Sequence, residues 1–121
     1  MVLVIADAPH KRLLLISEIY PPRIGGSGRW FWELYRRLPD DAVTIAAGEH
    51  SQSAAFDSAQ VGNVQRMPLA FNHCGLFDPR GVRDYWIALR GLRSILRVRD
   101  DKSRFSMIHA GRCLPEGWLA W

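Results

Sequence analysis

The sequence predicts an α/β domain with a Rossmann-like, open and mostly parallel sheet and flanking helices. Short continuous apolar runs, typical of strands buried on both faces, alternate along the chain with amphipathic segments of helical period. The chain has 121 residues, which is enough for one domain of this class. Its composition, 48% hydrophobic and 23% charged residues, is that of an ordinary globular protein.

The first predicted strand and helix flank a glycine-rich loop. Arg12–Ser17 is a run of leucine and isoleucine that a Pro-Pro turn ends, as expected of a buried strand. Arg29–Leu38 has helical periodicity, and Pro39 ends it. The apolar arc of that helix is expected to contain Trp30, Phe31, Leu34, Tyr35 and Leu38, with Trp32 at its edge.

Further strands are predicted at Ala42–Ala47 and Val64–Leu69, separated by a polar loop at Glu49–Asn63. A second loop is expected at Ala70–Gly81, because this segment contains Asn, Gly, Pro and Asp. The longest periodic segment, Val82–Val98, predicts a helix. Its expected inner face contains Val82, Tyr85, Trp86, Leu89, Leu92 and Leu96.

A fourth strand is predicted at Ser106–Ala110, and Pro115 is expected near the first position of a last helix. Residues 1–11 are expected to form a tail or an extra strand, and residues 12–121 the domain itself. In open parallel sheets, ligands bind outside the carboxyl ends of the strands. The loops Glu18–Gly28 and His109–Glu116 are predicted to lie there.

Charge and composition narrow the possible partners. The formal net charge is +4, mostly from arginine, and favours anionic partners such as phosphates, nucleotides or acidic lipid headgroups. No apolar run approaches the roughly 20 residues of a membrane span. Met1–Ala6 is too short for a signal peptide and lacks a basic region, so a cytoplasmic location is expected. Cys74 and Cys113 are expected to be reduced.

The glycine loop is the strongest functional candidate in the sequence. Gly25-Gly26-Ser27-Gly28 allows a ligand to approach the backbone, and the following helix would offer unpaired N–H groups to a phosphate. The alternative is a flexible strand–helix connection in which Ser27 caps the helix. The pattern is neither a Walker A motif nor a full dinucleotide fingerprint, because Phe31 stands where the third glycine would be. Pro21-Pro22 favours the ligand-binding interpretation, because it makes one side of the loop rigid.

Two segments carry a family resemblance. Glu18–Arg29 (EIYPPRIGGSGR), with its flanking strand and helix, resembles the opening of family 4-type glycosyltransferases of the GT-B fold. Met107–Trp121 (MIHAGRCLPEGWLAW) is similar to a later segment of the same domain, in which a strand leads to a histidine, a proline-containing turn and a helix. The resemblance covers most of Arg12–Trp121.

The resemblance implies the N-terminal, acceptor-side half of an enzyme that transfers a sugar from a nucleotide donor with retention of configuration. Gly25 and Gly26 match glycines whose backbone approaches the donor diphosphate, and Ser27, Gly28 and Arg29 extend that region. His109 matches a histidine that positions the donor sugar or acceptor. A sugar or a lipid-linked molecule is the implied acceptor, and neither a cofactor nor a metal is expected.

The second half of such an enzyme, which carries a pair of glutamates at the donor site, is not present in these residues. Glu18, Glu33, Glu49 and Glu116 do not have the family's spacing. The last segment, Leu114–Trp121, begins like a helix without a polar tail, so we expect the sequence to be the front part of a longer protein. This chain alone is therefore expected to be inactive, and to need the second domain in cis or in trans.

Two alternatives to this interpretation remain open from the residues. The chain could be a non-catalytic partner subunit of a split transferase, with the donor domain on another chain. It could also be a nucleotide-binding α/β domain, such as a flavodoxin-like one, that is unrelated to sugars.

Several other residues could bind anions or metals. Arg23 and Arg112 are candidates for additional phosphate contacts, and solvated surface arginines are the alternative. His73-Cys74 and His109-x-x-x-Cys113 contain zinc-ligand residue types, but their spacing is not that of a zinc site. No metal is therefore predicted.

The predicted Val82–Val98 helix also carries a basic stripe. Arg83, Arg90, Arg93 and Arg97 gather beside its apolar arc, and Trp86 lies at the boundary. This is the pattern of a helix that lies on an anionic membrane surface, such as the inner face of the cytoplasmic membrane. A core-packed helix with a solvated basic face is the alternative. Nucleic acid is not an expected partner, because neither a recognition helix nor an RNP-like motif is found.

Overall fold

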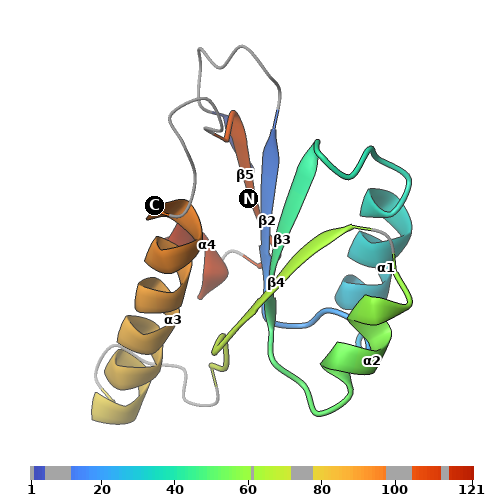
Figure 1. Cartoon of the computed structure of the whole chain (residues 1–121). Helices are drawn as coiled ribbons and strands as arrows, with labels where there is room; N and C mark the ends of the chain where they lie inside the picture. The colour runs from blue at the N-terminus through green and yellow to red at the C-terminus, as the bar shows by residue number, and fades with distance from the viewer. Residues whose placement is uncertain (1, 5–11, 61, 72–77, 98–104, 113–114) are drawn as a thin grey trace.

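The computed structural model contains one five-stranded sheet with helices on both faces (Figure 1). It describes residues 2–4, 12–60, 62–71, 78–97, 105–112 and 115–121. The order of strands in the sheet is β1-β5-β2-β3-β4. The strands are β1 (Val2–Val4), β2 (Leu13–Ser17), β3 (Val43–Gly48), β4 (Asn63–Met67) and β5 (Met107–Ala110).

The strands β2, β3, β4 and β5 are parallel, and β1 joins β5 in antiparallel orientation at one edge of the sheet. The predicted fold class, an open and mostly parallel Rossmann-like sheet, is therefore confirmed. An extra strand does form at the start of the chain, at Val2–Val4, whereas residues 5–11 lie outside the described part.

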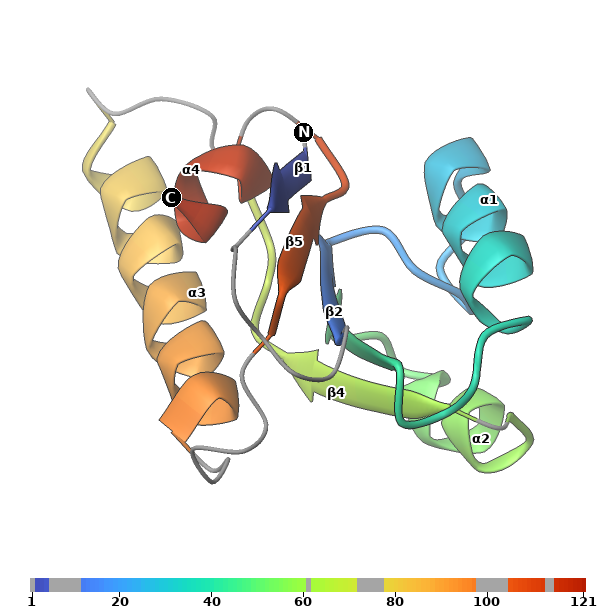
Figure 2. The same ribbon diagram turned by 90° about the horizontal axis from the view of Figure 1, so that it is seen from above.

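Helices cover the two faces of the sheet as separate pairs. The helices α1 (Gly26–Tyr35) and α2 (Ser53–Ser58) lie on one face. The helices α3 (Pro79–Arg97) and α4 (Glu116–Ala120) lie on the other, as both views show (Figures 1 and 2).

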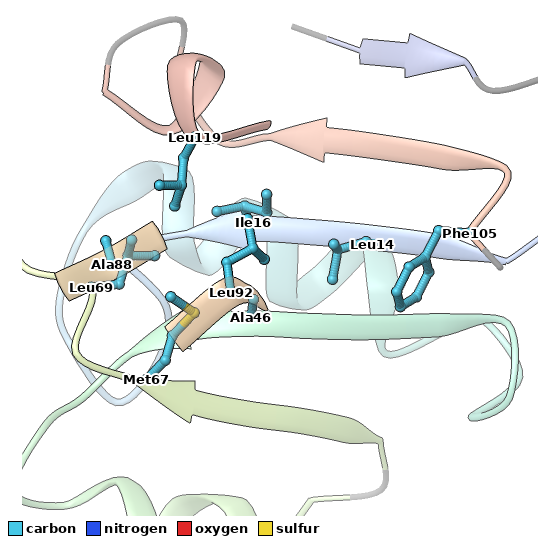
Figure 3. Close-up of a cluster of buried hydrophobic side chains, with 9 residues drawn as sticks. All are labelled: Leu14, Ile16, Ala46, Met67, Leu69, Ala88, Leu92, Phe105 and Leu119. Carbon is cyan, nitrogen blue, oxygen red and sulfur yellow. The ribbon is translucent and has the colours of Figure 1, made fainter. Parts of the chain in front are cut away.

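Alternation along the strands builds one core on each side of the sheet. Leu14 and Ile16 of β2 point toward α3 and α4, whereas Leu15 between them points toward α1. All three side chains are fully buried, because β2 is a central strand with a helical layer on each side. Figure 3 shows the first core, in which Met67 and Leu69 meet Ala88, Leu92 and Leu119 of the helices.

The first helix differs from its predicted form. It begins at Gly26 and ends at Tyr35, and its N-cap residue is Gly25, which makes no side-chain capping bond. Ser27 lies inside the first turn, so the alternative in which it caps the helix is wrong. Trp30 is also not in the core, because it is 59% exposed. The core face of α1 is narrow and centres on Phe31 and Tyr35, one helical turn apart, while Trp32 packs beside Phe56 of α2.

Two other segments differ from the prediction. The expected loop Glu49–Asn63 contains the short helix α2, at whose start the Ser53 hydroxyl accepts the N–H of His50. The long helix α3 starts at Pro79, earlier than expected, and the Asp78 carboxylate accepts the N–H of Arg80. Asp78 followed by Pro79 is a signal for the start of a helix. It was not recognised because the segment Ala70–Gly81 also contains the glycine and proline that are typical of a loop.

A smaller difference concerns the inner face of α3. Trp86 and Leu96, expected on the inner face of α3, are exposed, whereas Ala88 and Leu92 are buried. Pro115 is the N-cap residue of α4, next to the first helical position, as expected.

The start of α1 packs very closely against the chain that leads into it. A Cβ atom on Gly28 would lie 2.6 Å from the carbonyl oxygen of Ile19, whereas a Cβ atom on Gly26 would meet nothing within 4 Å. Gly28 is buried in the first turn of α1. The absence of a side chain at Gly28 therefore sets how near the helix lies to the loop.

We predict that Gly28→Ala lowers the free energy of unfolding by about 1–3 kcal/mol, because the added methyl group must push backbone atoms apart. Gly26→Ala, two residues earlier in the same turn, is the matched control and should change stability by less than about 1 kcal/mol. Urea denaturation of both variants measures the difference. Equal stability of the two variants would contradict the close approach.

Candidate functional site

The candidate site is the loop between β2 and α1, at the carboxyl end of the parallel strands. After Ser17 the chain passes through Glu18, Ile19 and Tyr20 to a cis Pro21–Pro22 peptide bond, and α1 starts at Gly26. The loop lies on the side of the sheet that α1 and α2 cover (Figure 1). Its position agrees with the prediction that Glu18–Gly28 follows a parallel strand at the edge where ligands bind.

Arg66 of β4 holds this loop from the side. Its guanidinium donates to the carbonyl oxygens of Pro21 at 2.6 Å and Gly48 at 2.9 Å. Two further bonds, of 2.9 Å and 2.7 Å, join it to the Asp57 carboxylate of α2. The Arg66 side chain is only 13% exposed. One side chain thus ties together the proline turn, the end of β3 and α2.

Tyr20, which precedes the proline turn, packs against Arg66. Its side chain is buried, and the guanidinium carbon of Arg66 lies 5.6 Å from its ring centroid. Burial raises the pKa of Tyr20 to about 12, although the positive charge of Arg66 acts in the opposite direction. Tyr20 therefore remains a neutral phenol at physiological pH.

The glycines around the loop are needed because a side chain would not fit, and not because their backbone angles are unusual. Gly25 has a φ of 177°, which is extended backbone open to any residue, but a Cβ atom there would lie 2.5 Å from the Ile19 side chain. A Cβ atom on Gly48 would lie 2.5 Å from the carbonyl oxygen of Glu18. A Cβ atom on Gly111 would lie 2.9 Å from Ser17 Oγ. The ends of three neighbouring strands thus meet around the loop with little space between them.

The N-terminus of α1 is open to an anion. Gly25 supplies no side-chain cap, and the first turn contains no acidic residue. Gly26, Ser27 and Arg29 are exposed, and the first helical hydrogen bond runs from the Arg29 N–H to the Gly25 carbonyl at 3.1 Å. The N–H groups that precede Arg29 carry the partial positive charge of a helix N-terminus.

An open groove of about 730 Å³ borders this N-terminus. It is lined by the loop from Pro21 to Gly26, by residues of α1 and by Phe56 of α2. Arg23 and Arg29 lie at the groove, as do the indole rings of Trp30 and Trp32. The Trp32 ring is fixed, because its Nε1–H donates to Gln60 at 2.8 Å. The groove combines arginines, loop backbone and aromatic rings with one carboxylate, Glu33.

The second predicted loop meets the first through a cluster of charged side chains. Glu18 accepts from Arg23 at 3.1 Å and from Arg112, while Arg112 also donates to Glu116 at 3.0 Å. Both glutamates are buried, and Glu116 also accepts the backbone N–H of Glu18 at 3.3 Å. Arg23 and Arg112 are thus brought together on one carboxylate. Their contact with a phosphate stays a prediction, and the two carboxylates oppose it electrostatically.

His109 lies in β5, one residue before the strand ends, and faces α1. Its Nδ1 is hydrogen-bonded to the hydroxyl of Tyr35, and its ring stands edge-on to Phe31 with the centroids 5.2 Å apart. Burial lowers the pKa of His109, so the ring is neutral at physiological pH. Its role in positioning a sugar stays a prediction.

The remaining candidates lie elsewhere or outside the described residues. The arginines of α3 and Trp86 belong to the helical layer on the opposite face of the sheet from α1 (Figure 1). His73, Cys74 and Cys113 fall outside the part of the chain that the structure describes. Within that part, no cluster of three or more His, Cys, Asp or Glu side chains could hold a metal ion.

Comparison with protein-family models and with curated proteins yields no match for this chain. The helices in the described residues include none with the length and apolar character needed to cross a bilayer.

We predict that Arg66→Met lowers the free energy of unfolding by about 3 kcal/mol or more, because Asp57 and two carbonyl groups lose their partner in a largely buried place. Arg37→Met, just after the end of α1, removes the same charge from a 73% exposed side chain and should cost less than about 0.5 kcal/mol. Urea denaturation compares the two variants. A similar cost for both would contradict the role of Arg66.

The lowered pKa of His109 predicts a pH dependence of stability. In the unfolded chain the group titrates near 6.5, and in the fold at a lower pH, so the unfolded state binds more protons between these values. The stability present above about pH 6.5 should therefore fall as the pH decreases through this window. Denaturation curves of the native protein and His109→Gln measure it.

The replacement should flatten the slope, while the control His50→Gln, at an exposed histidine, should keep it. If His109→Gln and the native protein have the same slope, burial does not control the protonation of His109.

Proposed function

We propose that this chain is the N-terminal, acceptor-side domain of a GT-B-type glycosyltransferase, and that the loop Pro21–Gly28 contacts the diphosphate of a nucleotide-sugar donor. The observation that carries the proposal is the uncapped N-terminus of α1, which opens into a groove beside Arg23 and Arg29. The resemblance of Glu18–Arg29 and of Met107–Trp121 to that family supports it.

In this proposal the backbone N–H groups near Gly25 and Gly26 stabilise the negative charge that develops on the departing diphosphate. Their contribution is electrostatic and depends on a rigid loop, because fixed dipoles need no reorganisation during the reaction. Arg66, Tyr20 and the close packing of Gly28 supply that rigidity. The Arg29 side chain adds a positive charge in the first turn of α1.

His109 acts as a neutral hydrogen-bonding group in the proposed reaction. Its lowered pKa and its bond to Tyr35 keep the ring uncharged and fixed in orientation. A neutral imidazole can bind a sugar hydroxyl, whereas it would not attract a phosphate as a cation does. A second domain, in cis or in trans, would supply most of the donor site, and transfer would occur between the two.

Binding of pyrophosphate and of UDP- and GDP-sugars tests the proposal. In a ¹⁵N NMR titration of the full chain, the amide signals of Gly26, Ser27 and Gly28 should shift most. Gly26→Val should keep the fold, because a Cβ atom there meets nothing within 4 Å, but its side chain would occupy the place of the ligand. We expect binding to weaken at least about tenfold, as for one lost hydrogen bond to a charged group.

The matched control Ala54→Val adds a similar side chain to the exposed start of α2 and should bind as the native chain does. Absence of shifts in the glycine loop, or full binding by Gly26→Val, would overturn the proposal. Parallel titrations with FMN and NAD separate it from an unrelated nucleotide-binding domain: such a domain should bind one of these much more tightly than pyrophosphate, whereas a loop that contacts only the diphosphate should not.

A further inference from the structure

The helix α3 has one face in the core and an opposite face that no described element covers. Gly81 and Ala88, seven residues apart and hence on one side, are buried, and Ala88 and Leu92 pack in the core against residues of the sheet. Gly91 also lies close to the sheet, since a Cβ atom there would be 3.1 Å from the Met67 side chain. These contacts fix the rotation of α3 about its axis.

The outward face of α3 is strongly basic. Arg83, Arg90 and Arg97 repeat every seven residues and form one stripe along the helix, and Arg93 lies beside it. Arg90, Arg93 and Arg97 are exposed, and the Arg83 side chain is 69% exposed. The helix carries one acidic residue, Asp84, whose side chain is only 12% exposed and is paired with Arg83 at 3.6 Å.

Two large apolar side chains stand among these arginines. Trp86 is 58% exposed, and Ile87 beside it is 43% exposed. Together with Arg83, Arg90 and Pro68 they border an open groove of about 430 Å³. Exposed apolar groups amid like charges are unfavourable in water, so this face fits a partner that offers both negative charge and apolar depth.

An anionic lipid bilayer has both properties. Its headgroups attract arginine, and tryptophan favours the boundary between headgroups and acyl chains. A nucleic acid would use the arginines, but Ile87 and the edge of Trp86 would gain little against phosphates. The helix is not one that crosses the bilayer; it would lie along the surface.

We propose that the outward face of α3, formed by Arg83, Trp86, Ile87, Arg90, Arg93 and Arg97, binds the surface of an anionic membrane. This surface is independent of the glycine loop, because α3 lies on the opposite face of the sheet from α1 (Figure 2). The site proposed for the diphosphate therefore remains accessible when α3 lies on a bilayer.

Co-sedimentation with vesicles tests this inference on the full chain. The chain should pellet with vesicles of phosphatidylcholine and phosphatidylglycerol, should bind phosphatidylcholine alone much more weakly, and should be released by salt. Arg90→Ser/Arg93→Ser should weaken binding by roughly thirtyfold, because each arginine near an anionic surface contributes about fivefold. Trp86→Ser, which leaves the charge unchanged, should also weaken it.

The matched control is Arg36→Ser/Arg37→Ser, which removes two arginines just after the end of α1 and should bind as the native chain does. Far-ultraviolet circular dichroism checks that every variant is folded. Equal binding to neutral vesicles, or unchanged binding by Arg90→Ser/Arg93→Ser, would overturn the proposal. So would binding to duplex DNA, but not to anionic vesicles, that is lost in the Arg90→Ser/Arg93→Ser variant.

Discussion

The geometry of the candidate site depends on Arg66, a charged side chain that reaches the β2–α1 loop from the sheet. Its planar guanidinium has enough donors to bond a carboxylate and two carbonyl groups at once, which a lysine ammonium would not match in shape. Because it joins the proline turn to β3 and α2, a movement of any one of them disturbs the others. The proline turn that leads to the glycines is thus tied to the sheet edge, although the composition of the loop is that of a flexible linker.

Charge is divided unequally between the carboxyl edge of the sheet and the outward face of α3. At the carboxyl edge, Arg23 and Arg112 are paired with Glu18 and Glu116, so positive charge there comes mainly from Arg29 and the backbone of α1. On the outward face of α3, the arginines have a single acidic neighbour on their own helix. The first arrangement suits one small anion held by directed bonds, whereas the second suits an extended negative surface.

Patterns that repeat within one element were readable from the sequence. The apolar run of β2 and the period of α3 predict a strand and a helix, because each pattern reports its own burial. Trp30 was misplaced because an amphipathic arc does not reveal how narrow the contact with the sheet is. Arg66, Gly48 and Gly111 were missed because their roles come from partners distant in sequence. The residues next to Arg66 in the sequence do not distinguish it from a solvated arginine in a strand. Its partner Pro21 lies 45 residues earlier.

The cluster of Glu18, Arg112 and Glu116 spans almost the whole chain. Glu18 and Glu116 are 98 residues apart, and β5 must insert between β1 and β2 before they can meet. Such distant pairings slow folding, because the entropy of closing a long loop is lost before the contact forms. During synthesis from the N-terminus, the glycine loop emerges early. Glu18 beside it can bond Glu116 only after α4 has been made. This constrains the order of assembly of the nascent chain. The strands β2, β3 and β4 can pair first, and β5 can pair with β2 only afterwards.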